Sequence, residues 1–159
     1  IKKLRERIPG VAIRSTFIVG FPGETDAQYQ ALRNFVEEMR FDKLGVLTYS
    51  REEGTPAYDM PNQVPEDVMQ ERFHDLMSLQ SKISEEINQE LEGREIEVLI
   101  EGRDSEQPNI AVGRSYREGP EVDGEVYIEN DTESQPGDIV RVKVLQGFTY
   151  DVVGERVDG

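Results

Sequence analysis

Two short segments carry the residue types that could most readily bind a ligand. The first is Gly20-Phe21-Pro22-Gly23-Glu24-Thr25, and the second begins at Tyr49-Ser50 and continues to Ala57. Each directly follows a run of β-forming residues, and parallel sheets bind ligands where their strands end. The first segment lacks the closing Lys-Ser/Thr of a phosphate-binding P-loop, and it does not match the dinucleotide fingerprint. On these residues alone, a plain tight turn is favoured over a ligand-binding loop.

Other kinds of site have little to draw on. Glu52 and Glu53 are adjacent and need not point the same way, so a general acid/base pair is weak beside a solvated polar loop. His74, the only histidine, falls outside the apolar stripe of its helix and has no second ligand at useful spacing. The chain contains no cysteine, which excludes thiolate metal sites, disulfides and cysteine nucleophiles within it. We therefore expect this chain to hold no metal.

The elements around the two segments predict a parallel sheet. Residues 11–19 are nearly continuous in β-formers, as in a strand buried on both faces. Thr25 and Gln28 resemble a capping box, and apolar spacing continues a helix to about Arg40. A second strand follows at residues 44–49. So short a crossover predicts a βαβ unit whose two ligand-type segments share one rim of the sheet.

The rest of the chain changes from helical to strand periodicity. Residues 50–64 are predicted to form a loop, and Pro65 suits the first position of a long helix. Its predicted apolar stripe comprises Phe73, Leu76, Leu79, Ile83, Ile87 and Leu91. From Arg94 onward apolar residues alternate with polar ones, in strand-like stretches near 94–101, 109–116, 122–129, 138–145 and 148–153. The natural closure is a small OB-like antiparallel β barrel.

The predicted fold class is therefore α/β followed by all-β. Its parts are an α/β region over residues 1–64, a connecting helix over 65–93 and a β domain over 94–159. Ile1, Leu4 and Ile8 already have helical spacing, and the first residue is not methionine, so we expect a piece of a longer protein. A short protein trimmed by processing is the alternative.

Charge favours a basic protein as partner. The formal net charge is −15, with −9 in residues 94–159 and −6 in residues 1–93. Such a surface repels phosphate backbones and attracts basic proteins, so little nucleic-acid binding is expected, although acidity could simply keep the protein in solution. No apolar run approaches the roughly 20 residues that span a bilayer, and no signal peptide is recognisable. We expect no membrane association and a cytoplasmic location.

The two segments, taken together, resemble a known enzyme family. Residues 14–25, followed at this distance by Tyr49-Ser50 and by residues 54–57, are similar to the radical S-adenosylmethionine methylthiotransferases, and the resemblance covers essentially the whole chain. Glu52-Glu53, residues 113–117 and residues 120–124 resemble the branch that modifies ribosomal protein. The resemblance implies that residues 1–64 are the C-terminal part of a TIM-like radical S-adenosylmethionine barrel and that residues 94–159 are a TRAM domain.

The same resemblance implies an activity and a site. The parent enzyme would use S-adenosylmethionine and two 4Fe–4S clusters to methylthiolate the β-carbon of an aspartate in small-subunit ribosomal protein twelve, a basic substrate recognised by the TRAM domain. The residues expected on the cosubstrate side are Gly20, Phe21, Pro22, Gly23 and Glu24, with Tyr49 and Ser50 beside them. The family's cluster-binding cysteines are absent, so this chain alone is expected to be inactive and to hold no cofactor, and its catalytic residues stay unknown. The alternatives are a fragment of a tRNA methylthiotransferase and a non-enzymatic acidic protein-binding module.

Overall fold

The first part of the chain is a βαβ unit with further helices. The computed structural model describes residues 1–157. Helix α1 (Lys2–Arg7) precedes strand β1 (Arg14–Val19), helix α2 (Asp26–Met39) and strand β2 (Lys43–Thr48). β1 and β2 pair in parallel along their whole length, from Arg14↔Lys43 to Val19↔Thr48. The parallel pairing predicted from the short crossover is confirmed.

Side chains form hydrogen bonds with free backbone groups at both ends of α2. The Gln28 amide donates to the Thr25 hydroxyl at 3.3 Å, and the Thr25 amide donates back to the Gln28 side chain at 3.0 Å. This is the predicted capping box, which removes two unpaired donors from the first turn. At the other end the Arg5 guanidinium donates to the carbonyls of Met39 and Arg40. The cation thereby neutralises the carbonyl end of the helix.

Only one face of the β1–β2 sheet is covered. On the packed face the Phe17 ring contacts the rings of Phe35 and Phe41, with centroids 6.3 and 5.8 Å away. On the opposite face Ile18 and Leu47, which pair across the strands, are 55% and 56% exposed. The expectation that this strand is buried on both faces is therefore wrong within the first unit, because no element of residues 1–83 packs over that side.

A single helix occupies most of residues 65–93. A 3₁₀ turn, η1 (Pro56–Asp59), interrupts the predicted loop, and helix α3 (Glu66–Gln89) begins directly after Pro65. The buried side of α3 carries Met69, Arg72, Leu76, Gln80 and Ile83. Leu76 and Ile83 were in the predicted stripe, whereas Phe73, Leu79 and Ile87 are only half-buried. The stripe is shifted because polar side chains share the buried face, where Gln80 donates to the Phe41 carbonyl at 2.9 Å.

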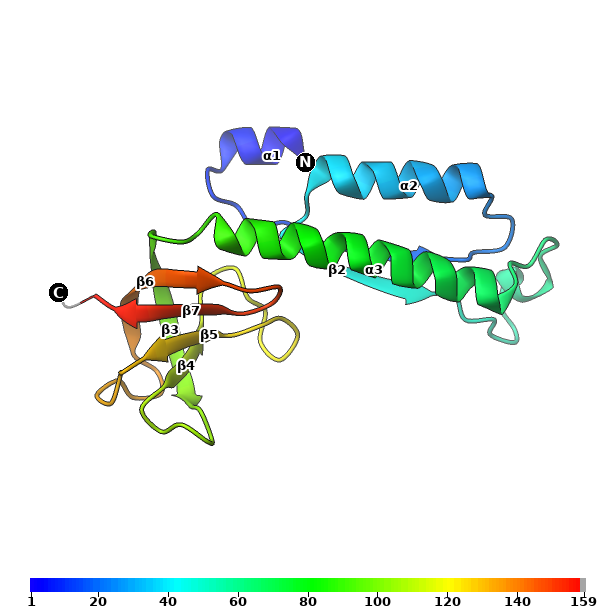
Figure 1. Ribbon diagram of the computed structural model, residues 1–159. Helices are drawn as coiled ribbons and strands as arrows, with labels where there is room; N and C mark the ends of the chain where they lie inside the picture. The colour runs from blue at the N-terminus through cyan, green and yellow to red at the C-terminus, as the bar shows by residue number, and fades with distance from the viewer. Residues whose placement is uncertain (158–159) are drawn as a thin grey trace. The chain divides into compact units, whose positions relative to one another are not determined.

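The chain divides into two compact units, Ile1–Ile83 and Ser84–Gly159 (Figure 1). Residues 158–159, the end of the predicted β domain, lie outside the described residues. Within the second unit the last turn of α3 packs on the barrel, and buried Asn88 donates to the Phe148 carbonyl at 2.7 Å. Arg117 donates to the Asn88 side-chain oxygen at 3.2 Å. A Cβ on Gly147 would lie 2.3 Å from the Asn88 backbone, so only glycine permits this approach.

The second unit is a closed five-stranded barrel. Its strands are β3 (Glu95–Arg103), β4 (Ala111–Arg114), β5 (Val126–Glu129), β6 (Ile139–Gly147) and β7 (Val152–Arg156), and the order around the barrel is β3-β4-β5-β7-β6. The core consists of Val98, Ile100, Ala111, Val126, Ile128, Val142, Val144 and Val152. The predicted alternation is confirmed in β5 and, up to the register shifts that follow Ile100 and Val144, in β3 and β6.

One prediction about this barrel is wrong. It was expected to be antiparallel throughout, but β5 and β7 pair in parallel, from Val126↔Val152 to Glu129↔Glu155. The reason is topological. In a closed ring with an odd number of strands, neighbouring strands cannot all run in opposite directions. At least one pair of the five must therefore be parallel. The barrel is therefore mixed.

Candidate functional site

The ends of β1 and β2 bring the two ligand-type segments together. The Tyr49 amide donates to the Val19 carbonyl at 2.8 Å, which places both segments at the same edge of the sheet. Just beyond the strands the rings of Phe21 and Tyr49 meet edge to face, with centroids 5.3 Å apart and planes at 73°. The shared rim predicted from the sequence is present, and it has an aromatic pair at its centre.

Gly20 and Gly23 of the first segment are glycine for different structural reasons. Both have positive φ, +80° at Gly20 and +87° at Gly23, which favours glycine strongly. At Gly20 an added Cβ would also lie 2.1 Å from Met69 Cγ, so α3 packs directly on this residue. At Gly23 nothing lies within 4 Å of such a Cβ. Gly20 is thus explained by packing, and only Gly23 leaves open space beside the turn.

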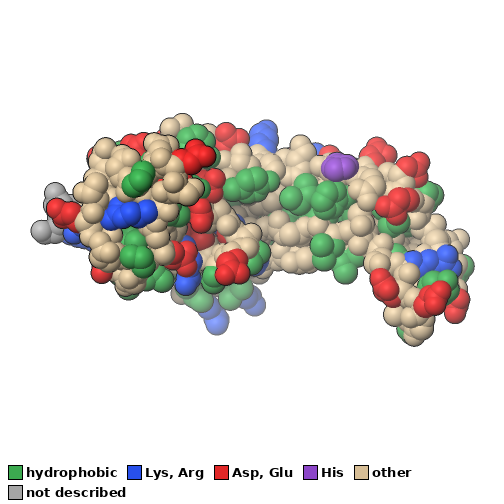
Figure 2. Space-filling view, turned by 90° about the horizontal axis from the view of Figure 1, so that it is seen from below, with side chains coloured by type: hydrophobic (Ala, Val, Ile, Leu, Met, Phe, Trp, Pro, Cys, Tyr) green, Lys and Arg blue, Asp and Glu red, His purple; other side chains and the backbone are tan. Residues whose placement is uncertain are grey.

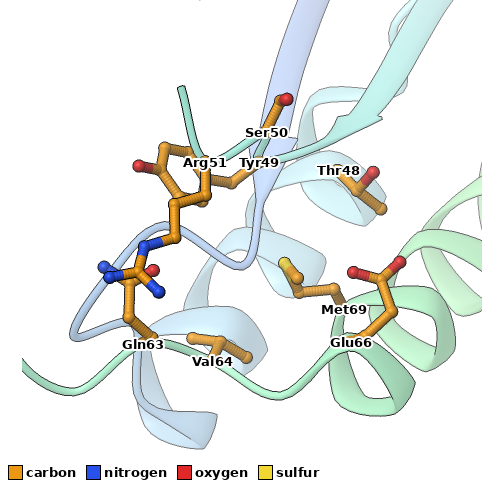
Figure 3. A pocket seen from close by; sticks show the side chains of 8 residues that line it. All are labelled: Thr48, Tyr49, Ser50, Arg51, Gln63, Val64, Glu66 and Met69. Atoms are coloured by element: carbon orange, nitrogen blue, oxygen red, sulfur yellow. The ribbon is translucent and has the colours of Figure 1, made fainter. Parts of the chain in front are cut away.

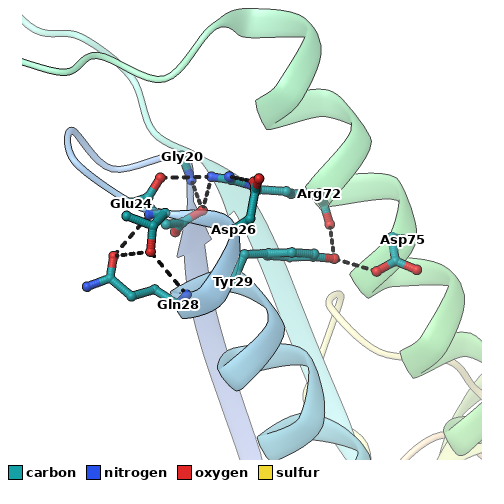
Figure 4. Close-up of polar contacts among 8 residues, drawn as sticks. Gly20, Glu24, Asp26, Gln28, Tyr29, Arg72 and Asp75 are labelled. Carbon is teal, nitrogen blue, oxygen red and sulfur yellow. Dashed lines mark hydrogen bonds and ion pairs between the residues drawn. The ribbon is translucent and has the colours of Figure 1, made fainter.

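Glu24 is tied down inside the protein (Figure 4). Its carboxylate accepts a 3.1 Å hydrogen bond from the Gly20 amide and a 2.7 Å hydrogen bond from Arg72 Nη1. The second guanidinium nitrogen of Arg72 donates to Asp26 at 2.7 Å. Arg72 is 6% exposed. The buried cation therefore connects α3 to the turn that follows β1.

A second polar group lies one turn further along α3. The Tyr29 hydroxyl donates to Asp75 at 2.6 Å, and Arg33 Nε donates to the same carboxylate oxygen at 3.0 Å. Burial, followed by the hydrogen bond to the anionic Asp75, raises the pKa of Tyr29 well above its usual value. Tyr29 therefore stays a neutral donor, and these residues fasten α2 to α3.

A pocket opens beside β2 (Figure 3). It has a volume of about 490 Å³, within the range of small-molecule sites. Its lining residues are Thr48, Tyr49, Ser50, Arg51, Gln63, Val64, Glu66 and Met69. Tyr49 and Ser50 of the predicted site are among them, whereas Gly20, Phe21, Pro22, Gly23 and Glu24 are not. Among residues 1–157 the Tyr49 hydroxyl oxygen is buried and has no hydrogen-bond partner.

The loop over this pocket is ordered by two side chains. Arg51 lies 4.4 Å from the centre of the Tyr58 ring and donates to the Tyr58 carbonyl at 2.9 Å. Gln63 donates to the carbonyls of Ala57 and Met60, at 3.1 and 2.9 Å. Glu52 and Glu53 are exposed on this loop. They do not form a buried acid/base pair.

Sequence reasoning missed Arg72, Met69 and Gln63. For Arg72 a signal existed, because it lies three residues after Met69 and four before Leu76, on the buried side of the helix. A charged residue in such a position is almost always paired. Nothing in the spacing identified its partner Glu24, which is 48 residues away.

The barrel has a second, strongly acidic pocket. Its volume is about 320 Å³, and its lining includes Glu101, Glu121, Asp123, Glu125 and Asp151, with Arg114 paired to Glu101 at 2.7 Å. Figure 2 shows acidic side chains spread over much of the face in view, with basic ones in a few places. His74, the single histidine, is exposed. Many of the acidic residues thus lie on the protein surface.

The described residues offer neither a metal-binding cluster nor a membrane-spanning helix. The chain has no cysteine, and residues 1–157 contain no group of three or more His, Asp or Glu side chains placed to hold a metal ion. Within the described part of the chain, no helix is both long enough and apolar enough to cross a membrane.

Comparison with known proteins assigns the barrel first. Residues 93–157 match the TRAM domain family, and the closed five-stranded barrel covers the same residues. The chain therefore carries a TRAM domain at residues 93–157, and an α/β region precedes it in the sequence.

Comparison along the whole of this chain then identifies related proteins. The chain is 47% identical over 155 residues to a ribosomal protein uS12 methylthiotransferase RimO from Desulforamulus reducens, covering 98% of this chain and 35% of the relative. It is 44% identical over 158 residues to the protein of the same name from Myxococcus xanthus, covering 99% of this chain and 33% of that relative. For the Nostoc protein of that name the identity is 50% over 157 residues, with 99% and 35% covered. Over nearly its whole length the chain is therefore similar to RimO-type methylthiotransferases, and it spans about a third of the length of these relatives.

Proposed function

We propose that this chain is part of a radical S-adenosylmethionine enzyme that methylthiolates the β-carbon of an aspartate in ribosomal protein uS12. The observation that carries the proposal is the identity of 44–50% to proteins named for that reaction, along nearly the whole chain. Within the enzyme we assign residues 1–64 to the last strands of the catalytic barrel, 65–93 to the connecting helix and 94–159 to the TRAM domain. A ribosomal substrate places the enzyme in the cytoplasm.

The residues of this chain fit S-adenosylmethionine but not the clusters. A pocket of about 490 Å³ with aromatic and polar walls suits an adenosyl group, and the buried Tyr49 hydroxyl, unpartnered among residues 1–157, is a donor that such a ligand could use. When bound in the intact enzyme and reduced by one electron, S-adenosylmethionine would supply the radical that removes hydrogen from the substrate carbon. Two 4Fe–4S clusters need thiolate ligands, and this chain has no cysteine, so we assign no step through the clusters here.

Within this proposal Tyr49 and Ser50 contribute to the wall of the cosubstrate pocket. Phe21 supports the Tyr49 ring from the first segment, and Gly23 leaves room beside the turn. Gly20, Pro22 and Glu24 act through the shape of that turn. The acidic barrel recognises the basic protein substrate, because its net charge of −9 attracts cations and repels RNA phosphates.

The test compares substrates for the intact enzyme. Reconstituted enzyme is incubated with uS12 or with bulk tRNA, and methylthiolation is measured by mass spectrometry of peptides and nucleosides. We expect modification of an aspartate in uS12 only, and none with residues 1–159 alone. Modified tRNA in place of modified uS12 would contradict the proposed substrate. If neither is modified while the protein still binds uS12, the chain belongs to a binding module.

A further inference from the structure

We propose that Arg72 is a positioning residue for the turn that ends β1, and that it acts on S-adenosylmethionine binding through Glu24. The inference rests on the proposed function, since it takes the edge of β1 and β2 as the cosubstrate side. Arg72 belongs to α3 and touches none of the residues expected there except Glu24. Its part in the site is therefore indirect.

Of the two ion pairs that Arg72 forms, the one with Glu24 is the buried one. The side chains of Arg72 and Glu24 are 7% and 13% exposed, and Nη1 lies 2.7 Å from Glu24 Oε1. The same nitrogen lies 3.3 Å from the Glu24 carbonyl oxygen. The Asp26 side chain, although also 2.7 Å from the guanidinium, is 99% exposed. Solvent screens that second pair, so Glu24 is the partner that matters.

Glu24 passes this restraint to the backbone. The carboxylate oxygen that binds Arg72 also accepts the Gly20 amide at 3.1 Å. Gly20 is the first residue after β1 and holds φ at +80°. Without Arg72, Glu24 would be a buried anion with no cation, and rotation toward water would relieve it. The Gly20 amide would then lose its acceptor, and the turn would lose the conformation that aims Phe21 at Tyr49.

The control comes from the same two helices. Arg33 of α2 pairs with Asp75 of α3 at 3.0 Å, and its side chain is 30% exposed. It thus supports the packing of α2 on α3, and its ion-pair partners Asp75 and Glu37 do not belong to the turn after β1. R33M should reproduce a general loosening of these helices and leave the turn intact. R72K keeps the positive charge and should rescue part of the effect of R72M.

The experiment uses the intact enzyme with R72M, R72K and R33M. Hydrogen–deuterium exchange is followed in peptides spanning residues 17–25, without cosubstrate, and steady-state kinetics are measured against S-adenosylmethionine. We expect exchange in these peptides to rise about tenfold in R72M only. We expect the KM for S-adenosylmethionine to rise about tenfold in R72M and less in R72K, with kcat largely retained.

Two results would overturn the role of Arg72. One is equal exchange of the turn in R72M and R33M, and the other is a fall in kcat with unchanged KM, as expected from a smaller folded fraction. Failure of the proposed function is distinguished by the parent enzyme itself, because then the unsubstituted protein turns over no S-adenosylmethionine. In that case the exchange data alone decide whether Arg72 positions the turn.

Discussion

Replacing Gly20 with alanine should destabilise the first unit more than the same change at Gly23. Both residues have positive φ, where an added Cβ costs about 1–2 kcal/mol. At Gly20 the new Cβ would also lie 2.1 Å from Met69 Cγ and 2.5 Å from its sulfur, whereas at Gly23 it meets nothing within 4 Å. The pair of variants therefore separates backbone strain from overpacking.

The size of the difference follows from the position of Met69. Its Cγ is set by χ1, which has only two common values in a helix, and the side chain is 8% exposed. Moving it aside means repacking a buried site, which typically costs about 1–3 kcal/mol. We expect G20A to lower the free energy of unfolding by about 2–5 kcal/mol, and G23A by about 1–2 kcal/mol.

Urea unfolding of the intact protein, followed by the helical circular dichroism signal, measures both effects. M69A completes a double-mutant cycle, because it removes the atoms that the new Cβ would strike. In the G20A background M69A should recover about 1–3 kcal/mol relative to its effect in the parent protein. The reasoning fails if G20A costs no more than G23A, or if G20A and M69A are additive. Because Gly20 has this packing role, G23A is the cleaner variant for testing cosubstrate contact.

Three further predictions concern single polar groups. Burial raises the pKa of Asp131, but hydrogen bonds from the Ser134 hydroxyl and amide outweigh it and lower the pKa below its usual value. The ionised Asp131 therefore stabilises the fold fully above the unfolded pKa of about 3.9, and this stabilisation is lost as pH falls through the folded pKa. We expect D131N to lower the unfolding free energy by about 2 kcal/mol at neutral pH, measured by denaturant titration. This deficit should shrink in acid. N88A should lower the unfolding free energy of the barrel by about 1–3 kcal/mol in thermal scans, because the Phe148 carbonyl loses a donor and the buried Arg117 loses an acceptor; an unchanged midpoint would contradict this. Y49F should leave stability unchanged or raise it by about 1 kcal/mol, since that hydroxyl has no partner among residues 1–157, and should weaken S-adenosylmethionine binding in calorimetry.

The sequence predicted those features that depend on local patterns. The capping box at Thr25 and the alternation in the barrel strands follow from spacings of two to four residues, and both are present. The existence of a parallel pair could have been predicted, because a closed ring of five strands must contain at least one, but the spacing did not say that the pair is β5–β7. The shift of the buried side of α3 was missed for another reason. Arg72 and Gln80 bury polar groups whose partners, Glu24 and the Phe41 carbonyl, are distant in sequence.

The residues of the first segment have different structural roles in the turn that follows β1. Gly20 is required by the approach of Met69, Glu24 binds the Gly20 amide and Arg72, and Thr25 caps α2. The side chains of Glu24 and Thr25 are therefore engaged in hydrogen bonds within the protein. Phe21, which is 44% exposed and packs on Tyr49, and the open side of Gly23 are what this turn presents outward. Under the proposed function, this segment would therefore contribute the shape of its backbone and one aromatic ring to the cosubstrate site, and polar contacts would come from the residues after β2.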